Sequence, residues 1–190
     1  MDVTVVLSLV AWLAPLFLAL LFRPRLALTT EKERCREVVT VRYPAGACRG
    51  LYIRVWVHNF GVLPPKECSV FVNRILWNGQ VIESQRSPLN WTDKDVFTPQ
   101  TIARGFSRGL YADVCAADQI IPALQVKSEK ASKGYGLYGQ GGIYKFEISA
   151  EGSGVTSNGF ISLEVEHDGR QWDGLRTVSA RPKGKWFRWW

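Results

Sequence analysis

Residues 51–79, LYIRVWVHNFGVLPPKECSVFVNRILWNG, contain the pattern that decides the fold. Apolar side chains occupy every second position of 51–57, which is typical of a β-strand with one face in a core. A turn at 59–65, containing Asn-Phe-Gly and Pro-Pro, ends this strand, and a second strand is predicted at 68–77. Asn78-Gly79 then predicts a hairpin, because both residue types tolerate positive φ. The stretch therefore predicts an antiparallel sheet.

The rest of the chain repeats this pattern. Further strands are predicted at 38–43, 80–84, 109–115, 123–127, 143–150, 161–165 and 175–180. Segments 85–100 and 134–142, rich in turn-forming residues, are predicted to be loops. Turns recur every ten to fifteen residues and no long amphipathic helix interrupts them. We expect a mainly β fold, an antiparallel β-sandwich of about eight strands, because two such sheets bury each other's apolar faces.

The N-terminal segment from Val3 to Phe22 contains no charged residue and is followed by Arg23-Pro24-Arg25. Twenty helical residues extend roughly 30 Å, which matches the hydrocarbon core of a bilayer. The segment therefore predicts one transmembrane helix before the sandwich. A cleaved signal peptide is an alternative, but no small residues follow the apolar stretch. A buried core helix is a second alternative, disfavoured because only Thr4 and Ser8 are polar.

Charge predicts the orientation of this span. No Lys or Arg precedes it, whereas five basic residues follow at 23, 25, 32, 34 and 36. Positive residues remain on the cytoplasmic side, so the C-terminal domain is predicted to be cytoplasmic. An extracytoplasmic domain is the alternative, because a short uncharged N-terminus gives a weak orientation signal.

The net charge of +7 is concentrated at the two ends of the chain. Residues 1–36 have a charge of +2 and residues 181–190 of +4, whereas residues 37–180 have only +1. A nearly neutral domain does not offer a basic groove, so no nucleic-acid partner is expected. The distribution instead favours attraction to a membrane surface.

The C-terminal segment 181–190, RPKGKWFRWW, interleaves basic and aromatic residues. Tryptophan prefers the bilayer interface and Lys and Arg prefer anionic headgroups. Packing of this tail on the domain and contact with a protein partner are the alternatives. The candidate membrane-interface residues of the chain are Arg23, Arg25, Lys183, Lys185, Trp186, Phe187, Arg188, Trp189 and Trp190.

These features divide the chain into four predicted parts. They are a transmembrane helix at 3–22, a basic flank and stalk at 23–37, the sandwich at 38–180 and the tail at 181–190. Thr30 and Glu33 have capping-box spacing, so the stalk is expected to be a short helix or a continuation of the membrane helix.

No catalytic, cofactor-binding or metal-binding residues are predicted. His58 and His167 are expected to be solvated, at an outward strand position and in a turn. The four cysteines, at 35, 48, 68 and 115, match no zinc spacing, and they suit either two disulfides or four thiols. No P-loop, zinc-protease or nucleophile-elbow motif occurs.

The chain from about 38 to 180 resembles immunoglobulin-like domains of the CARDB type found in single-span bacterial membrane proteins. The shared motifs are an N-x-G turn, a C-x-V strand, an L-x-W loop, a D-V strand and a G-x-Y strand, here Asn59–Gly61, Cys68–Val70, Leu89–Trp91, Asp113-Val114 and Gly142–Tyr144. The resemblance implies an Ig-like sandwich and membrane anchoring, and it transfers no active-site residues.

Together these features predict a non-catalytic, single-pass, membrane-anchored interaction module. Its expected partners are membrane lipid and a protein that the sequence does not name. One alternative is an exported Ig-like module for adhesion or ligand binding. Another is an enzyme whose site is built from loops.

Overall fold

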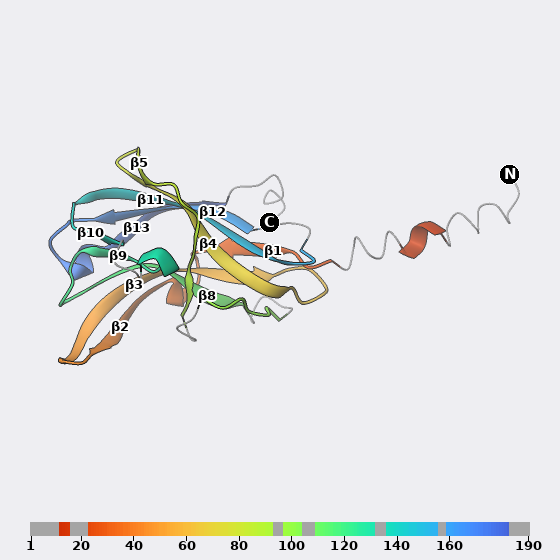
Figure 1. The fold of residues 1–190 in the computed structure, drawn as a ribbon, viewed down its shortest axis with the longest axis horizontal. Coiled ribbons are helices and arrows are strands. Elements are labelled where there is room, and N and C mark those ends of the chain that lie inside the picture. Colours follow the sequence, from red (N-terminus) through yellow and green to blue (C-terminus); the bar gives the residue numbers. More distant parts are fainter. Residues whose placement is uncertain are drawn as a thin grey trace, which may run out of the picture.

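The computed structural model describes residues 12–15, 23–92, 97–103, 109–131, 136–155 and 159–182. It confirms a mainly β fold made of two antiparallel sheets (Figure 1). The elements are β1 (Leu26–Thr29), η1 (Glu33–Cys35), β2 (Arg36–Tyr43), β3 (Gly46–Asn59), β4 (Lys66–Trp77), β5 (Gln80–Glu83), β6 (Ser87–Pro88), β7 (Asn90–Trp91), β8 (Leu110–Asp118), β9 (Leu124–Val126), β10 (Leu137–Tyr138), β11 (Gly142–Ser153), β12 (Gly159–His167), η3 (Trp172–Gly174) and β13 (Arg176–Pro182).

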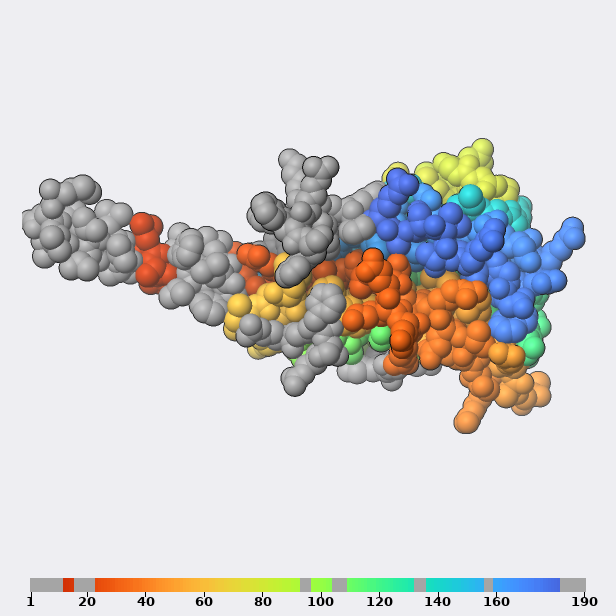
Figure 2. Space-filling model, turned by 180° about the vertical axis from the view of Figure 1, so that it is seen from behind, coloured from red at the N-terminus to blue at the C-terminus, as the bar shows by residue number. Residues whose placement is uncertain are grey.

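The first sheet has the order β1-β3-β8-β9-β10, and the second has the order β13-β12-β11-β4-β5. In the first sheet β2 also pairs with β3 and β7 with β8, while β6 pairs with β4 in the second. The β2–β3 hairpin, in orange, projects from the body of the domain (Figure 2).

Both sheets contribute to one hydrophobic core. The predicted inward positions of β3, Leu51 to Val57 in steps of two, are at most 1% exposed. Phe146 on β11 and Leu163 on β12 meet them from the second sheet, both completely buried. Two antiparallel sheets that share a core are the arrangement expected of a β-sandwich.

The predicted hairpin at Asn78-Gly79 is confirmed, with φ of 47° and 86°. The prediction of a plain loop at 85–100 is wrong for its first part. There β6 pairs with β4 of the second sheet and β7 with β8 of the first, so the chain changes sheets at the buried Leu89. Strands of two residues show no alternation, which explains why the pattern did not indicate them.

The predicted stalk at 23–37 is also wrong, because the domain begins before residue 38. Leu26–Thr29 pairs with the end of β3, and Leu26, Ala27 and Leu28 are at most 2% exposed. Only Glu33–Cys35 is helical, as a single 3-10 turn. The apolar Leu-Ala-Leu triplet is more stable inside the core than in a solvated stalk.

The outer face of β3 is buried as well, which corrects the expected half-buried strand. Arg54 and Trp56 are each 3% exposed and His58 is 7% exposed. The segment that was expected to be a stalk covers them: the Lys32 ammonium lies 4.7 Å from the Trp56 ring, and the Glu37 carboxylate pairs with the Arg54 guanidinium.

Residues 12–15 are helical. Among the residues that the structure describes, no helix has the length and apolar character needed to cross a bilayer. The remainder of the predicted span, and tail residues 183–190, lie outside the described residues.

Candidate functional site

A surface groove lies at one end of the second sheet, where β4 finishes at Trp77. We call it the far-end groove, and its lining residues are Trp77, Ile82, Leu137, Tyr138, Gly139, Gln140 and Tyr144. Its volume is about 200 Å³. Because β4 has twelve residues, its first residue Lys66 lies roughly 35 Å from the groove. We call the Lys66 end, which also contains residues 23–26 and 59–65, the base.

Hydrogen bonds to the backbone shape the groove. The Trp77 indole N–H donates to the carbonyl of Gly141 at 3.2 Å, and the Tyr144 hydroxyl donates to the carbonyl of Gln140 at 2.6 Å. The Tyr138 and Tyr144 rings lie 5.8 Å apart in a tilted arrangement. Segment 137–144 is therefore held against the end of β4 by aromatic side chains.

Glycine is required at position 142 for this packing. Gly142 has a φ of 145°, and a Cβ there would lie 2.7 Å from the Trp77 indole nitrogen. Next to it, the Ile143 N–H donates to the Asn78 side-chain oxygen at 3.0 Å. The hairpin turn and the start of β11 consequently form one unit.

The rim of the groove is apolar and exposed. Of the lining residues, Ile82 on β5 is 38% exposed and Leu137 on β10 is 59% exposed. Val81, which pairs with Leu76 and points to the other face of the sheet, is 51% exposed beside them. β5 ends the second sheet and β10 ends the first, so both are edge strands in the described part of the chain. In Figure 2 the β4–β5 hairpin, in yellow, stands out at the end away from residue 23. Exposed apolar edge strands invite pairing with another chain.

A second groove of about 290 Å³ lies on the other side of Leu137. Its lining residues are Asn90, Phe97, Gln125, Val126, Lys127, Ser128, Ala131, Gly136 and Leu137. Ligand pockets for small molecules usually reach 300–1,000 Å³ and enclose their ligand. Two shallow grooves on either side of one exposed leucine are better suited to contact with another macromolecule than to enclosing a small molecule.

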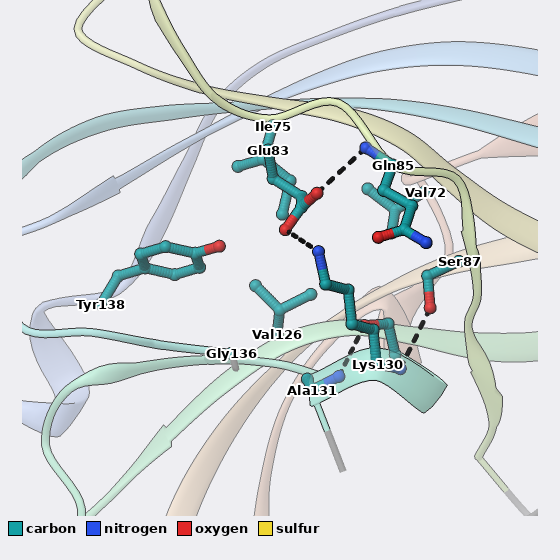
Figure 3. A pocket seen from close by; sticks show the side chains of 11 residues that line it. Val72, Ile75, Glu83, Gln85, Ser87, Val126, Lys130, Ala131, Gly136 and Tyr138 are labelled. Atoms are coloured by element: carbon teal, nitrogen blue, oxygen red, sulfur yellow. Dashed lines mark hydrogen bonds and ion pairs between the residues drawn. The ribbon is translucent and has the colours of Figure 1, made fainter. Parts of the chain in front are cut away.

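Between the two sheets, an ion pair closes the opening beside these grooves (Figure 3). The Lys130 ammonium lies 2.7 Å from the Glu83 carboxylate, and the Gln85 N–H donates to the same carboxylate at 3.0 Å. Ser87 accepts a hydrogen bond from the Lys130 N–H at 3.1 Å. The enclosed space is about 10 Å³, enough for about one water molecule. This cavity is too small for a substrate.

The ionisable groups here have shifted pKa values. Burial acts to raise the pKa of Glu83, but the hydrogen bonds from Lys130 and Gln85 outweigh it and lower the pKa. Burial raises the pKa of the Tyr138 hydroxyl, with a contribution from Glu83, and burial likewise raises that of Tyr144. The tyrosines are therefore neutral at pH 7 and Glu83 is ionised.

A buried charge network lies on the outer face of the first sheet. The Arg54 guanidinium lies 2.7 Å from the Asp113 carboxylate, and the two side chains are 4% and 7% exposed. The Thr92 hydroxyl donates to the same carboxylate at 2.7 Å. The network joins β3, β8 and the residue after β7, and its side chains do not line the three cavities described above. Its geometry is that of a structural ion pair.

Both histidines are buried, which corrects the expectation that they are solvated. His58 stacks on Trp56 with ring centroids 4.5 Å apart. His167 is 1% exposed, and its ring accepts the Gly169 N–H at 3.1 Å and contacts the Pro122 carbonyl at 2.9 Å. Both ring nitrogens of His167 thus bond to backbone, which ties β12 to the turn after β8.

The four cysteines are thiols without disulfides, and Cys35, Cys68 and Cys115 are buried. Burial raises the pKa of Cys35 and of Cys68 to about 11 and that of Cys115 further. Cys48 is partly exposed and contacts the Asp118 carboxylate at 3.8 Å. Across the described residues, no group of three His, Cys, Asp or Glu side chains could hold a metal ion.

The structure places two of the predicted membrane-interface residues, Arg23 and Arg25, at the base. The last described residue, Pro182, pairs with Ile161 near the start of β12, and Gly159 of that strand packs on Ala27. Residue 182 therefore lies two strand positions from the β12 residue that packs on β1. The tail candidates, from Lys183 to Trp190, lie outside the described residues.

Comparisons of the chain with protein-family models, curated proteins and solved structures find no match. The motif positions that carry the resemblance have structural roles here: Asn59 and Gly61 form the base turn, and Leu89 and Trp91 fill the core.

Sequence reasoning missed the far-end groove. Trp77 ends a predicted strand, whereas Leu137 and Tyr138 lie in a predicted loop. The one available signal was the pair Leu137-Tyr138, which are apolar and aromatic side chains in a predicted loop where polar residues are usual.

Proposed function

We propose that this protein is a non-catalytic, single-pass membrane protein whose Ig-like β-sandwich binds a protein partner through the far-end groove. The observation that supports this most strongly is the exposed apolar rim on two edge strands, which lies at the opposite end of β4 from residue 23. An anchored domain that exposes such a rim away from its anchor is suited to contact another protein.

Membrane anchoring is supported by the apolar stretch 3–22 and by the helical residues within it. Trp12 and Leu13 are 84% and 53% exposed, and side chains of this kind are more stable in lipid than in water. β13 ends two strand positions from Gly159, which packs on Ala27 of β1, and this would allow the span and the tail to engage one membrane.

A non-catalytic role is supported by the ionisable groups at the groove. Glu83 is already paired with Lys130, and the nearby tyrosine hydroxyls have raised pKa values. No activated nucleophile or poised general base results from this arrangement.

The test is site-specific photocrosslinking of the full chain in its membrane. A photoreactive amino acid at Leu137 is expected to form a defined protein adduct that Trp77→Ala weakens. The matched control is the same amino acid at Val178, which is 49% exposed on the opposite edge strand β13. Identical adducts at both positions, or none at Leu137, would contradict the proposal.

We also propose that the domain is cytoplasmic, as supported by the basic residues after the span and by the four thiols. Because Cys48 is the thiol that is not buried, an impermeant maleimide should label it only after the membrane is opened. Cys48→Ser should abolish that labelling. Labelling of intact cells would instead support the exported alternative.

A further inference from the structure

At the base, a turn is fixed against the residues that directly follow the predicted span. The buried Asn59 side-chain oxygen accepts the Arg25 N–H at 3.0 Å and the Gly61 N–H at 2.9 Å. Its amide nitrogen donates to the Leu63 carbonyl at 2.7 Å. One side chain thus joins the start of the domain to both halves of the turn.

Two further contacts close this joint. The Phe60 N–H donates to the Arg25 carbonyl at 3.0 Å. A Cβ on Gly61 would overlap the Arg23 carbonyl oxygen and would lie 2.7 Å from the Arg25 nitrogen, so only glycine allows this approach. The turn therefore cannot move independently of Arg23 and Arg25.

This rigid turn exposes apolar side chains. Phe60 is 49% exposed and Leu63 is 51% exposed, although Asn59, the last residue of β3, is completely buried. Lys66 and Glu67 follow the turn with opposite charges, so Arg23 and Arg25 give this end a net positive charge. Apolar side chains among arginines are typical of a surface that enters the headgroup region.

We propose that Phe60 and Leu63 insert into the bilayer interface beside the span and set the orientation of the domain. This inference rests on the proposed membrane anchor. The span would end at Phe22, and adjacent Cα atoms are about 3.8 Å apart, so Arg23 must lie at the bilayer boundary. Since the turn is bonded to residues 23–25, it must lie at that boundary too. A lipid surface is therefore the occupant that the chain connectivity selects.

The test uses the full chain in vesicles of phosphatidylcholine and phosphatidylglycerol. A fluorescent amino acid replaces Leu63, and nitroxide-labelled lipids report its contact with the interface. The same label at Ile120, which is 55% exposed in the turn after β8, is the matched control. We expect several-fold stronger quenching at Leu63 than at Ile120, with Phe60 as a second labelled site that behaves like Leu63.

The possible outcomes distinguish failure of this inference from failure of the proposed membrane anchor. If the chain floats with the vesicles but Leu63 and Phe60 are quenched no more than Ile120, the inserted turn is wrong and the anchor stands. A blue-shifted emission at Leu63 without lipid quenching would show a protein contact and would also overturn the inference. If the chain does not float, the anchor itself is wrong and the inference fails with it.

Discussion

The base of the domain and its far end are held by different interactions. At the base, one buried asparagine bonds to three backbone groups of two segments. At the far end, aromatic rings and a partly exposed ion pair hold the groove, and apolar rim residues remain exposed. Buried polar bonds cost more to break than exposed ones. The base is therefore expected to be held more rigidly than the far end, where side chains can rearrange at lower cost.

The largest effect is expected from Asn59→Ala. The change should lower the free energy of unfolding by about 4 kcal/mol, because three hydrogen bonds are lost and the Arg25 and Gly61 N–H groups have no other acceptor. Denaturant titration of the full chain in detergent measures it. The matched control is Asn73→Ala, since the Asn73 side chain bonds to the Ser149 hydroxyl in a partly buried site, and this change should cost under about 1 kcal/mol. Equal costs would show that the asparagine at the base is held no more tightly than one in the middle of β4.

Lowering the pH should destabilise the fold at the base of the domain, because His58 becomes protonated. Burial, with a smaller contribution from Lys32, lowers the pKa of His58 to about 4 from an unfolded value of 6.5. Below pH 6.5 the unfolded chain binds the proton more readily, so this stabilisation is present above pH 6.5 and is lost as the pH falls toward 4. The loss is about 3 kcal/mol at most. Unfolding curves between pH 7 and pH 4 should show it in the parent chain and not in His58→Phe.

A pair of glycine substitutions compares the two ends directly. Gly61→Ala should destabilise the protein by about 2 kcal/mol, because the new methyl group would overlap the backbone of residues 23–25. Gly139→Ala in the far-end groove should change stability by less than about 0.5 kcal/mol, since nothing lies within 4 Å of the added carbon. Thermal unfolding of both variants measures this. A larger cost at Gly139 would show that the far end is as tightly held as the base.

An effect smaller than that of Gly61→Ala is expected at the ion pair beside the groove. Glu83→Gln should cost under about 1 kcal/mol, because the paired side chains of Lys130 and Glu83 are 33% and 19% exposed. The pKa of Glu83 is lowered, so the contribution is present above pH 4.5 and is lost as the pH falls below it. The parent and variant curves should therefore converge in acid. Lys130→Met is the companion variant, and a cost of several kcal/mol from either variant would show that the ion pair is more deeply buried than its partial exposure implies.

The sequence pattern predicted the long strands because each has several residues in register with a shared core, as in β3 and β11. It could not predict β6, β7 or β10, since two residues show no period. It also placed residues 26–29 in a stalk, because their three apolar residues directly follow a basic flank. The outer face of β3 is buried because residues 32–37 pack against it. The alternation of apolar and polar residues within a strand gives no information about such a contact.

The far-end groove was harder to predict than the fold. Its rings come from β4, β10 and β11, and their contact depends on how the two sheet edges face each other. The base turn was partly visible, because Asn59-Phe60-Gly61 marks a turn. Its connection to Arg25 depends on the pairing of β1 with β3, a strand pair that the pattern did not indicate.

The central claim is that the base faces the bilayer and the far-end groove faces away from it. The most direct test is energy transfer from a single donor fluorophore to acceptors at the vesicle surface, with the donor placed on the full chain at Leu63 or at Leu137. Strong transfer from Leu63 and much weaker transfer from Leu137 is predicted, because the length of β4 separates the two ends. Equal transfer from both sites, or stronger transfer from Leu137, would contradict the claim.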